Sequence, residues 1–554
     1  MSSSEDDNDY EPSIRSLDTS DESASSSDNG YSLSSEEEEE EDGRIWCRHV
    51  VSEECMLPPP PRFPFTGNPG ISIDQDTADM TPLDFFSLLC DNRIIDRVVD
   101  ETNRFAEQIG ERDCMWRPVT KAEICVFFAL KMLGGIVKMP DQEMNWSKDE
   151  LLERPIFRKL ISLKRHNKIK QYLHFVNNET FDAETHPNPK LYKVYDVFMM
   201  FSENFMKCYT PNQDLSIDKS LMLFKGRLGW VQHIPLKRRR FGVQYFFLCE
   251  AKTGYVYRVI IYVGKGTQFD SEYSEYPMSS RVVLSLMKPL LGKGYCVTVD
   301  NFYTSPQLAD TLVSHYTDIY GTLHLNRKEV PDQLKRAKLK KGEVAAFQRG
   351  KVMILRWKDK KDVTMLSTIH NPIMKDVETR QGPVKTPTVV YDYNFTMGGV
   401  DKVDQQLVDY PITRKWGKKY YKKVFFHLMD LAVWNSYILY SVAVTEAGKK
   451  ALTHLKFRMQ IIRDIIAKYG ADLQTTKVVG RPSTSPGCSR FTPGHFPMEV
   501  PATEKKTNPT RKCAVCCLKR DHRGKPVRKE SRYMCRLCNV PLCVVPCFEK
   551  YHTK

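Results

Sequence analysis

The chain has 554 residues, of which 41% are hydrophobic, and it carries a formal net charge of +13. Because a single hydrophobic core stops growing near ~250–300 residues, this length predicts several domains. The N-terminal residues contain no apolar segment after a positive start, and apolar runs such as Val126 to Val137 are too short to span a bilayer. We therefore expect an intracellular protein with no membrane partner and no small-molecule substrate.

The charge is divided unevenly along the chain. Residues 1–42 contain 16 acids and one base, for a net charge of −15, so the other 512 residues carry +28. Residues 1–60 are rich in Ser, Asp and Glu and end in a run of prolines, so no core offsets the entropy of ordering them. We predict a disordered acidic arm there, which either keeps a basic protein soluble or regulates it. The basic remainder makes nucleic acid the first partner to expect.

Helical patterns follow the arm. Thr81, Pro82 and Asp84 form a helix start, because Thr81 can cap, Pro82 suits the first turn and Asp84 favours the positive helix end. Apolar residues then recur at three- and four-residue spacing, and similar patterns run on to Phe205. A later apolar segment, 424–442, is expected to form a buried helix.

After Pro211 the pattern becomes strand-like. Residues 243–250 and 255–263 are rich in aromatic and β-branched residues and flank a turn, and helices and strands then alternate as far as Leu323. This order predicts the α/β class, with a layer built on a mixed sheet. A basic and less regular stretch after it resembles an insertion.

The shifts in composition and pattern divide the chain into eight expected parts. They are a disordered acidic N-terminal arm (1–60), the first part of a helical domain (61–210), the first part of the α/β domain (211–325), an insertion (326–385), the last part of the α/β domain (386–410), the second part of the helical domain (411–474), a Pro-rich linker (475–510) and a Cys-rich domain (511–554).

Acidic residues stand where strands of the predicted sheet end. Asp218 and Asp300 each close a short strand, and Asp401 and Asp404 share one face of a predicted helix because they are three residues apart. Phosphoryl transfer by two hard cations ~3.5–4 Å apart needs carboxylates that converge from separate elements. Acids at strand ends are also common as turn formers, so the spacing alone leaves both interpretations open.

Basic residues follow the first of these acids. Phosphate contact is the physical expectation for bases beside a metal cleft, which applies to Lys225 and Arg227. A longer basic run lies a little further on, at Lys237, Arg238, Arg239 and Arg240. This run either contacts DNA or serves as a nuclear import signal or a solvated turn.

A second basic segment interleaves bases with aromatic residues. It contains Trp416, Lys418 and Lys419, just after the second pair of acids. Such a segment can bind a nucleic-acid backbone and stack an unpaired base. The alternative is that Trp416 anchors the helix that follows.

The C-terminal cysteines have the spacing of metal ligands. The candidate ligands are Cys513, Cys516, Cys535, Cys538, Cys543, Cys547 and His552. In a reduced protein, two Cys-x2-Cys pairs this close indicate one or two structural zinc ions. We expect an interleaved arrangement in which the first Cys pair shares a metal with part of the Cys543/Cys547 group. The other three ligands then form a second site, and Cys517 or His522 is the candidate for the missing ligand.

The same module is strongly basic. Residues 511–554 carry 12 bases and three acids, a net charge of +9, on a proline-rich tether. A small basic zinc domain suggests recognition of a DNA end. Interleaved zinc spacing is also typical of RING-like or reader modules that bind proteins, but the charge favours DNA.

Three segments resemble the acid blocks of piggyBac-type transposases, in the same order and with suitable separations. They are Leu215–Asp218 followed by Phe224–Arg227, then Val299–Ser305, then Gly398–Gln405. The resemblance runs from about Phe65 to the C-terminus. It includes Tyr410-Pro411, Asn435-Ser436-Tyr437 and the Cys-rich module.

This resemblance implies an RNase H-like catalytic core, interrupted by an insertion before its last helix and flanked by a helical dimerisation and DNA-binding domain in two sequence pieces. It implies Mg²⁺ ions, two in number, at Asp218, Asp300 and Asp401, with Asp404 as an additional required acid and Trp416 near the DNA end. The implied activity is cut-and-paste transposition, by water-driven cleavage and strand transfer, through hairpinned ends and into TTAA sites. The implied protein is a nuclear homodimer acting on double-stranded DNA, namely transposon terminal repeats and TTAA targets.

One position departs from the family pattern. Lys219 stands where many relatives carry an acid. Because adjacent strand residues face opposite sides of a sheet, Lys219 need not contact the metal ions.

Two other functions compete with transposition. A host-domesticated relative would bind DNA or chromatin without cutting it, although a protein that only binds has no need of four acids. A ubiquitin ligase built around the zinc module would leave the acid blocks unexplained.

Overall fold

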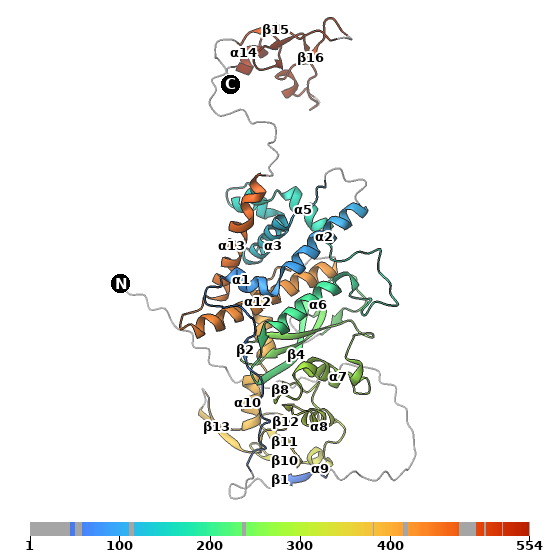
Figure 1. Cartoon of the computed structure of the whole chain (residues 1–554), viewed down its shortest axis with the longest axis vertical. Coiled ribbons are helices and arrows are strands. Elements are labelled where there is room, and N and C mark those ends of the chain that lie inside the picture. Colours follow the sequence, from blue (N-terminus) through green and yellow to red (C-terminus); the bar gives the residue numbers. More distant parts are fainter. Residues whose placement is uncertain are drawn as a thin grey trace, which may run out of the picture. The chain divides into compact units, whose positions relative to one another are not determined.

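The computed structural model describes residues 45–49, 58–109, 116–234, 240–379, 382–413, 419–475, 495–503, 506–522 and 524–552. The chain forms two compact units, Met1–Thr475 and Thr476–Lys554 (Figure 1). None of the helices in these described ranges is long and apolar enough to cross a bilayer.

Two segments far apart in the sequence build the helical part of the first unit (Figure 1). The first segment contains α1 (Pro82–Leu89), α2 (Asn92–Ile109), α3 (Lys121–Ile136), α4 (Pro155–Leu160), α5 (Leu163–Tyr172) and α6 (Tyr192–Lys207). The second contains α12 (Tyr420–Glu446) and α13 (His454–Thr475). α13 packs on α3, and α12 packs on α1 and α6. The helical character expected for both segments is confirmed.

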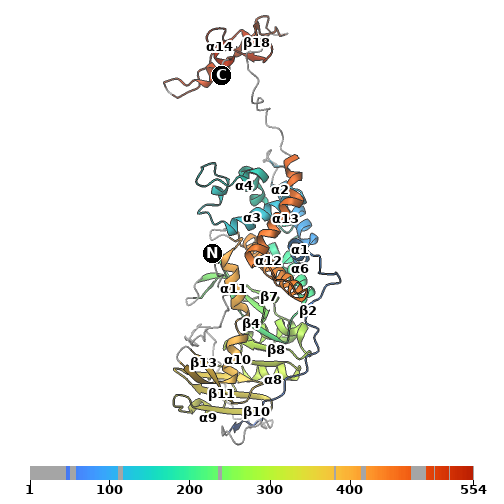
Figure 2. The same cartoon turned by 90° about the vertical axis from the view of Figure 1, so that its left-hand side faces the viewer.

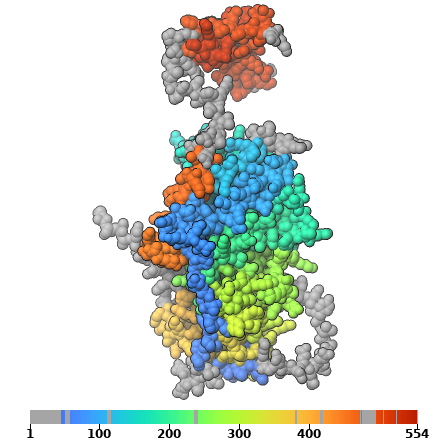
Figure 3. Space-filling model, viewed as in Figure 1, coloured from blue at the N-terminus to red at the C-terminus, as the bar shows by residue number. Residues whose placement is uncertain are grey.

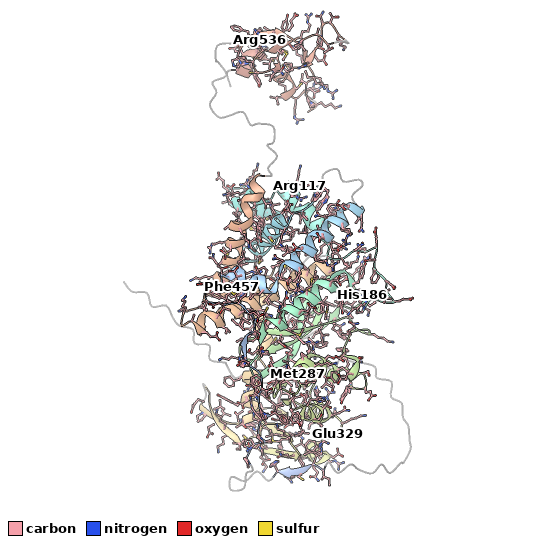
Figure 4. The ribbon with its side chains drawn as sticks, viewed as in Figure 1. Arg117, His186, Met287, Glu329, Phe457 and Arg536 are labelled. Atoms are coloured by element: carbon pink, nitrogen blue, oxygen red, sulfur yellow. The ribbon has the colours of Figure 1, made fainter. Side chains whose placement is uncertain are left out.

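Local signals and aromatic packing explain these helices. Thr81 caps α1 as predicted, since its hydroxyl accepts the Asp84 N–H at 3.3 Å and its own N–H donates to the Asp84 carboxylate at 2.8 Å. α12 is buried along most of its length, as expected for 424–442. Phe457 of α13, labelled in Figure 4, lies with its ring centroid 5.5 Å from that of Tyr437 on α12. Burial of these rings joins the two sequence segments into one core.

A ten-stranded sheet forms the rest of the first unit. Its strands are β1 (Cys47–His49), β4 (Asp214–Leu223), β5 (Gln232–His233), β6 (Phe241–Glu250), β7 (Val256–Tyr262), β8 (Cys296–Val299), β9 (Asp318–Thr322), β10 (Val344–Arg349), β11 (Val352–Lys358) and β12 (Asp362–Ser367). Their order is β1-β10-β11-β12-β9-β8-β4-β6-β5, with β7 also paired to β6.

The middle of this sheet is the RNase H-like arrangement that the sequence predicts. β4, β6 and β7 pair antiparallel in succession, while β8 and β9 add to β4 in parallel. Between them the chain forms α7 (Met278–Met287) and α8 (Pro306–Ser314). After the insertion come α10 (Thr388–Thr396) and α11 (Gly399–Asp409), which lie on the opposite side of the sheet from α8 (Figure 2).

The stretch over 326–385 is more regular than expected. β10, β11 and β12 form an antiparallel meander, and β12 pairs with β9, for example Met365 with Thr322. They therefore continue the central sheet. Only α9 (Asp332–Arg336) and the hairpin of β13 (Met374–Thr379) and β14 (Gly382–Pro387) stand outside it. The strands were not predicted because many bases of this stretch lie in α9 and in the turns between the strands, such as Lys341 and Lys360, and mask the strand pattern.

The expectation of disorder over 1–60 is wrong for residues 45–49. β1 pairs antiparallel with β10, which would otherwise be the edge of the sheet. Trp46 lies against the guanidinium of Arg349, with 4.8 Å between the ring centroid and the Arg349 Cζ. A segment without a core of its own gains order here because the strand edge offers unpaired backbone groups. Residues 1–44 and 50–57 lie outside the described residues.

An extended segment after Pro58 crosses the starts of the parallel strands, and Figure 3 shows it as a blue strip over the sheet region. Its Phe63 N–H donates to Asp318 at 2.9 Å, and Arg62 pairs with Asp214 at 2.8 Å. Asp318 is fully buried and also accepts from Thr368 at 2.8 Å. The strip therefore contacts the first residues of β4 and β9.

The second unit is small and begins earlier than the predicted residue 511. Its strands are β15 (Pro497–Glu499), β16 (Arg511–Lys512), β17 (Glu530–Ser531), β18 (Tyr533–Cys535) and β19 (Val540–Pro541), followed by α14 (Cys547–His552). β15 pairs with β18, so part of the expected linker over 475–510 belongs to the folded module. The prolines of this segment made a strand unexpected. Pro497 is compatible with β15 because it is the first residue of the strand, where a missing N–H is tolerated.

Candidate functional site

Asp218 and Asp300 lie side by side at the point where two parallel strands part. The register of β4 and β8 pairs Ile217 with Val299, and the two acids are the next residue on each strand. β4 itself continues to Leu223 in its pairing with β6, so the prediction that Asp218 ends a strand is wrong. What ends there is the parallel partner β8, at Val299, and Asp218 is partly buried.

A tight turn holds the second acid. Asp300 Oδ1 accepts the Phe302 N–H at 3.0 Å, and its backbone carbonyl accepts the N–H groups of Tyr303 and Thr304 at 3.1 and 3.2 Å. Arg327 donates to the carbonyl oxygens of Asn301 and Phe302 in the same turn, the first at 3.1 Å. Sequence reasoning missed Arg327, because its contact joins residues 25 and 26 positions apart with no local pattern.

α11 brings Asp401 close to β4. A Cβ on Gly399 would lie 2.3 Å from Ser216 Oγ and 3.1 Å from the Glu250 carbonyl oxygen. The absence of a side chain therefore lets the helix begin directly against the strand, with Asp401 in its first turn. This explains why glycine precedes the acid pair.

Asp404 is fixed one turn further along the same helix. Ser220, which shares a face of β4 with Asp218, donates its hydroxyl to Asp404 Oδ1. Burial raises the pKa of the Cys249 thiol, and the charges of Asp404 and Asp218 raise it further. The buried Cys249 thiol therefore interacts electrostatically with both Asp404 and Asp218.

Tyr393 on α10 shows that the other acids also converge. Burial raises the pKa of its hydroxyl, and the charges of three acids add to the effect, namely Asp300, Asp218 and Asp401. Strand register, the Ser220–Asp404 hydrogen bond and the docking of Gly399 on β4 place the four predicted acids in one region of the sheet. They come from β4, from the residue after β8 and from α11. A cluster of carboxylates is the oxygen-rich donor set that Mg²⁺ prefers.

Lys219 lies beside one of the four acids, Asp300. Its ammonium Nζ lies 3.9 Å from Asp300 Oδ2 and 3.6 Å from the centroid of the Phe302 ring. The alternation of side chains does hold, since Lys219 pairs with Phe246 on the face opposite Asp218. The side chain of Lys219 is nevertheless long enough to reach Asp300.

The predicted DNA-contacting residues lie on connecting segments. Lys225, Arg227 and Arg240 are exposed between β4 and β6. The remaining residues of the two predicted segments lie outside the described residues: Lys237, Arg238, Arg239, Trp416 and Lys418. Lys419 is exposed and directly precedes α12.

Lys419 lies close to another lysine with a different role. Burial lowers the pKa of Lys422 to about 8, with smaller effects from Lys419 and Lys170. Lys422 Nζ donates to the Lys170 and Gln171 carbonyl oxygens at 2.7 and 2.9 Å, at the end of α5. Lys422 therefore caps a helix, which leaves Lys419 as the exposed base of the pair.

Four cysteines gather in the second unit as the interleaved arrangement predicts. Cys513, Cys516, Cys543 and Cys547 place their sulfur atoms within 4.8 Å of one another. Burial, together with the neighbouring cysteines, raises the pKa of Cys547 to about 12. Backbone N–H groups overcome burial at Cys513 and lower its pKa to about 7. Four thiolates this close need a cation between them, so the group fits zinc.

A second group contains a ligand that sequence reasoning missed. His495 joins Cys535, Cys538 and His552, with all ligand atoms within 4.8 Å of one another. His495 Nδ1 lies 3.4 Å from the Cys535 sulfur and 3.3 Å from that of Cys538. His552 donates from Nδ1 to the Phe548 carbonyl oxygen at 2.7 Å, which turns Nε2 toward the group.

The expected eighth ligands were wrong. Neither Cys517 nor His522 belongs to either group within the described residues. His495 escaped notice because it lies in the proline-rich stretch, 18 residues before Cys513 and without Cys-x2-Cys spacing. Its only sequence signal is that it is the last histidine before the cysteine cluster.

An RNase H-like sheet with acids at its central parallel strands is an arrangement that metal-dependent nucleases and transposases share. A family model described as Transposase IS4 matches residues 81–437, more than half of the chain. The chain belongs to this transposase family, of the piggyBac type. A second model, a DDE_Tnp_1-like zinc finger, matches residues 497–553 and coincides with the second unit.

Known proteins resemble the chain over most of its length. The human piggyBac transposable element-derived protein 3 is 26% identical over 502 residues, which cover 87% of this chain and 78% of that protein. The human protein 5 of the same series is 23% identical and covers 74% of this chain and 79% of its own length. The piggyBac transposase in a synaptic complex with hairpin DNA has a TM-score of 0.65 at 23% identity, covering 86% of this chain and 99% of that one. At this low identity, the similarity to the solved piggyBac transposase structure shows the fold alone.

Proposed function

We propose that this chain is a metal-dependent cut-and-paste DNA transposase of the piggyBac type. The observation that carries the proposal is the convergence of four acids on one RNase H-like sheet, with Ser220 and Gly399 dedicated to placing α11 and Asp404 against β4. A protein that only binds DNA has no use for a costly cluster of like charges.

The acids would hold divalent metal through Asp218, Asp300 and Asp401, with Asp404 beside them. When bound, two Mg²⁺ ions supply Lewis-acid activation of water or a 3′-hydroxyl and stabilise the leaving oxygen. The chain's own contribution is to fix the carboxylates before metal arrives. The turn at Asp300 and the Ser220 hydroxyl do this with hydrogen bonds, so little reorganisation remains for the chemical step.

Basic residues near the acids would position the DNA. Lys225, Arg227 and Arg240 are exposed on the segments that leave β4 and enter β6, and Lys419 begins α12. Such side chains neutralise phosphates and set the register of the duplex without reading its sequence. We also assign DNA contact to the basic run from Lys237, and to Trp416 with Lys418, on their sequence pattern alone.

The C-terminal unit would recognise transposon ends. Its two tetrads fit two structural zinc ions, one with four thiolates and one with two thiolates and two imidazoles. The basic surface of the module supplies affinity for DNA. Insertion at TTAA, a homodimeric state and a nuclear location complete the proposal, on the family resemblance and on the DNA partner.

The test is cleavage of a DNA duplex that carries the element's own terminal repeats, in Mg²⁺. Asp218→Ala, Asp300→Ala and Asp401→Ala should each abolish cleavage while leaving binding of the duplex intact. Asp409→Ala is the matched control, because Asp409 is an exposed acid at the other end of the same helix. Retained cleavage in all three variants would rule out the assigned site.

A second candidate is binding of DNA without cleavage. The contact between Lys219 and Asp300 favours it, and so does the similarity to human proteins named as derived from transposable elements. Absence of cleavage by the unaltered chain on every matched end, together with specific binding of those ends, would establish this alternative.

A further inference from the structure

Lys219 places a positive charge inside the acid cluster, and the inference below rests on the proposed function. The side chain is only 14% exposed, and its ammonium group lies 3.9 Å from Asp300 Oδ2. No local rule predicts this contact, because Lys219 leaves β4 on the face opposite Asp218.

Two aromatic rings define the position of the ammonium group. Lys219 Nζ lies 3.6 Å from the Phe302 ring centroid and 5.6 Å from that of Tyr303. Both distances are within the range in which an aromatic face attracts a cation. Tyr303 is fully buried, so its ring is a fixed wall.

The same turn holds the acid and the ring. Asp300 Oδ1 accepts the N–H of Phe302, and Arg327 donates to the Phe302 carbonyl oxygen. Any movement of Phe302 would therefore also move the Asp300 carboxylate. Lysine, ring and acid therefore form one unit, which the hydrogen bonds of the turn hold together.

A divalent ion at Asp300 would have to share that carboxylate with the ammonium group. Mg²⁺ binds a carboxylate oxygen at about 2.0–2.1 Å, so the ion and Lys219 Nζ would be close neighbours of like charge. Their repulsion opposes metal binding, and the rings of Phe302 and Tyr303 favour keeping the ammonium where it is.

We infer that Lys219 is a positioning residue that limits metal loading at Asp300, by acting as a resident counter-ion of the acid cluster. As a counter-ion, Lys219 offsets part of the mutual repulsion of the acids. The same charge raises the concentration of divalent ion that the site needs.

The test measures metal binding directly on the full chain with its zinc bound and without DNA. Mn²⁺ is the probe, and the loss of the free Mn²⁺ signal in electron paramagnetic resonance reports binding. Lys219→Met removes the charge and keeps the aliphatic stem, so it should tighten Mn²⁺ binding by about tenfold or more, given the strength of a unit charge near 4 Å. Lys219→Arg keeps the charge and should bind Mn²⁺ as the unaltered chain does.

Two controls separate the inference from the proposed function. Lys293→Met removes an exposed lysine at the other end of the sheet and should leave the Mn²⁺ affinity unchanged. Asp300→Ala should abolish the same binding. If Asp300→Ala binds Mn²⁺ as before, the acid site and the proposed function fail together.

A different outcome overturns the inference alone. Equal Mn²⁺ affinity of the unaltered chain and Lys219→Met, with binding lost in Asp300→Ala, would show that the lysine has no influence on a real metal site. Circular dichroism verifies that each variant is folded. Lys219→Gln, with the same expected tightening, replaces the methionine variant if that one does not fold.

Discussion

The acid cluster and the C-terminal tetrads are both sets of metal ligands, but they relate to their surroundings in opposite ways. The acids lie on a sheet whose core is made of other residues, and hydrogen bonds from Ser220 and the Phe302 backbone hold them in place. In the C-terminal unit the ligands are the core, since its buried apolar cluster consists of Cys513, Cys516, Cys535, Leu542 and Cys547. The sheet should therefore fold without metal at its acids. The C-terminal unit should need metal in order to fold.

Removal of the metal ions should show the difference between the two regions most clearly. A chelator that strips zinc should unfold the C-terminal unit, because structural zinc contributes about 10–16 kcal/mol per ion in small zinc domains. The melting transition of the first unit should stay where it was. Circular dichroism and the melting curve of the full chain, with and without chelator, measure the two effects. A C-terminal unit that keeps its fold without zinc would remove the distinction.

A substitution at His495 tests the second tetrad by itself. His495→Ala should lower the zinc content of the chain, measured by mass spectrometry of bound metal, because it removes one ligand of the second tetrad. His522→Ala is the matched control, since His522 is exposed in the same unit and lies outside both groups. Equal zinc content in the two variants would exclude His495 as a ligand.

A substitution at Gly399 tests how rigidly the sheet places α11. Gly399→Ala puts a Cβ 2.3 Å from Ser216 Oγ, and overpacking of this kind costs about 1–3 kcal/mol. We expect a lower free energy of unfolding in urea and a larger loss of cleavage, because Asp401 and Asp404 move with the helix. Adding Ser216→Gly should restore part of both quantities. The Glu250 carbonyl oxygen, at 3.1 Å, limits the recovery.

Acid should weaken the helical part of the first unit. Burial lowers the pKa of His166 and His454 to about 3, whereas unfolded histidine titrates near 6.5. Below about pH 6.5 the unfolded chain binds protons that the folded chain does not. Stability is therefore lost at about 1.4 kcal/mol per pH unit for each histidine. Burial raises the pKa of Asp430 to about 6, which opposes the loss below that pH.

One variant isolates this contribution. His454→Gln removes the titrating ring while the side chain can still bond to Gln406. The difference in its unfolding free energy between pH 7 and about pH 5.5 should be smaller than that of the unaltered chain by about 1.4 kcal/mol. His522→Gln, an exposed position, serves as the control and should show no such change. An identical pH dependence for His454→Gln would contradict the prediction.

Local patterns in the sequence accounted for much of the fold and for the candidate ligands. Thr81 and Asp84 mark the start of α1, and the apolar run of 424–442 forms a buried helix, because capping and periodicity act over a few residues. The acids and the Cys-x2-Cys pairs were also found, since their chemistry requires particular residue types at short spacing. The insertion strands were read less well, because their stability comes from pairing with β9.

What the sequence by itself determined is which residue types are available for metal and DNA, and where helices and turns begin. The tertiary structure decided their partners. His495 reaches Cys535, Ser220 reaches Asp404, and Lys219 reaches Asp300 only because separate elements pack together. The physical reason is that these contacts depend on strand register and helix docking, which the whole buried core sets and no local stretch of sequence contains.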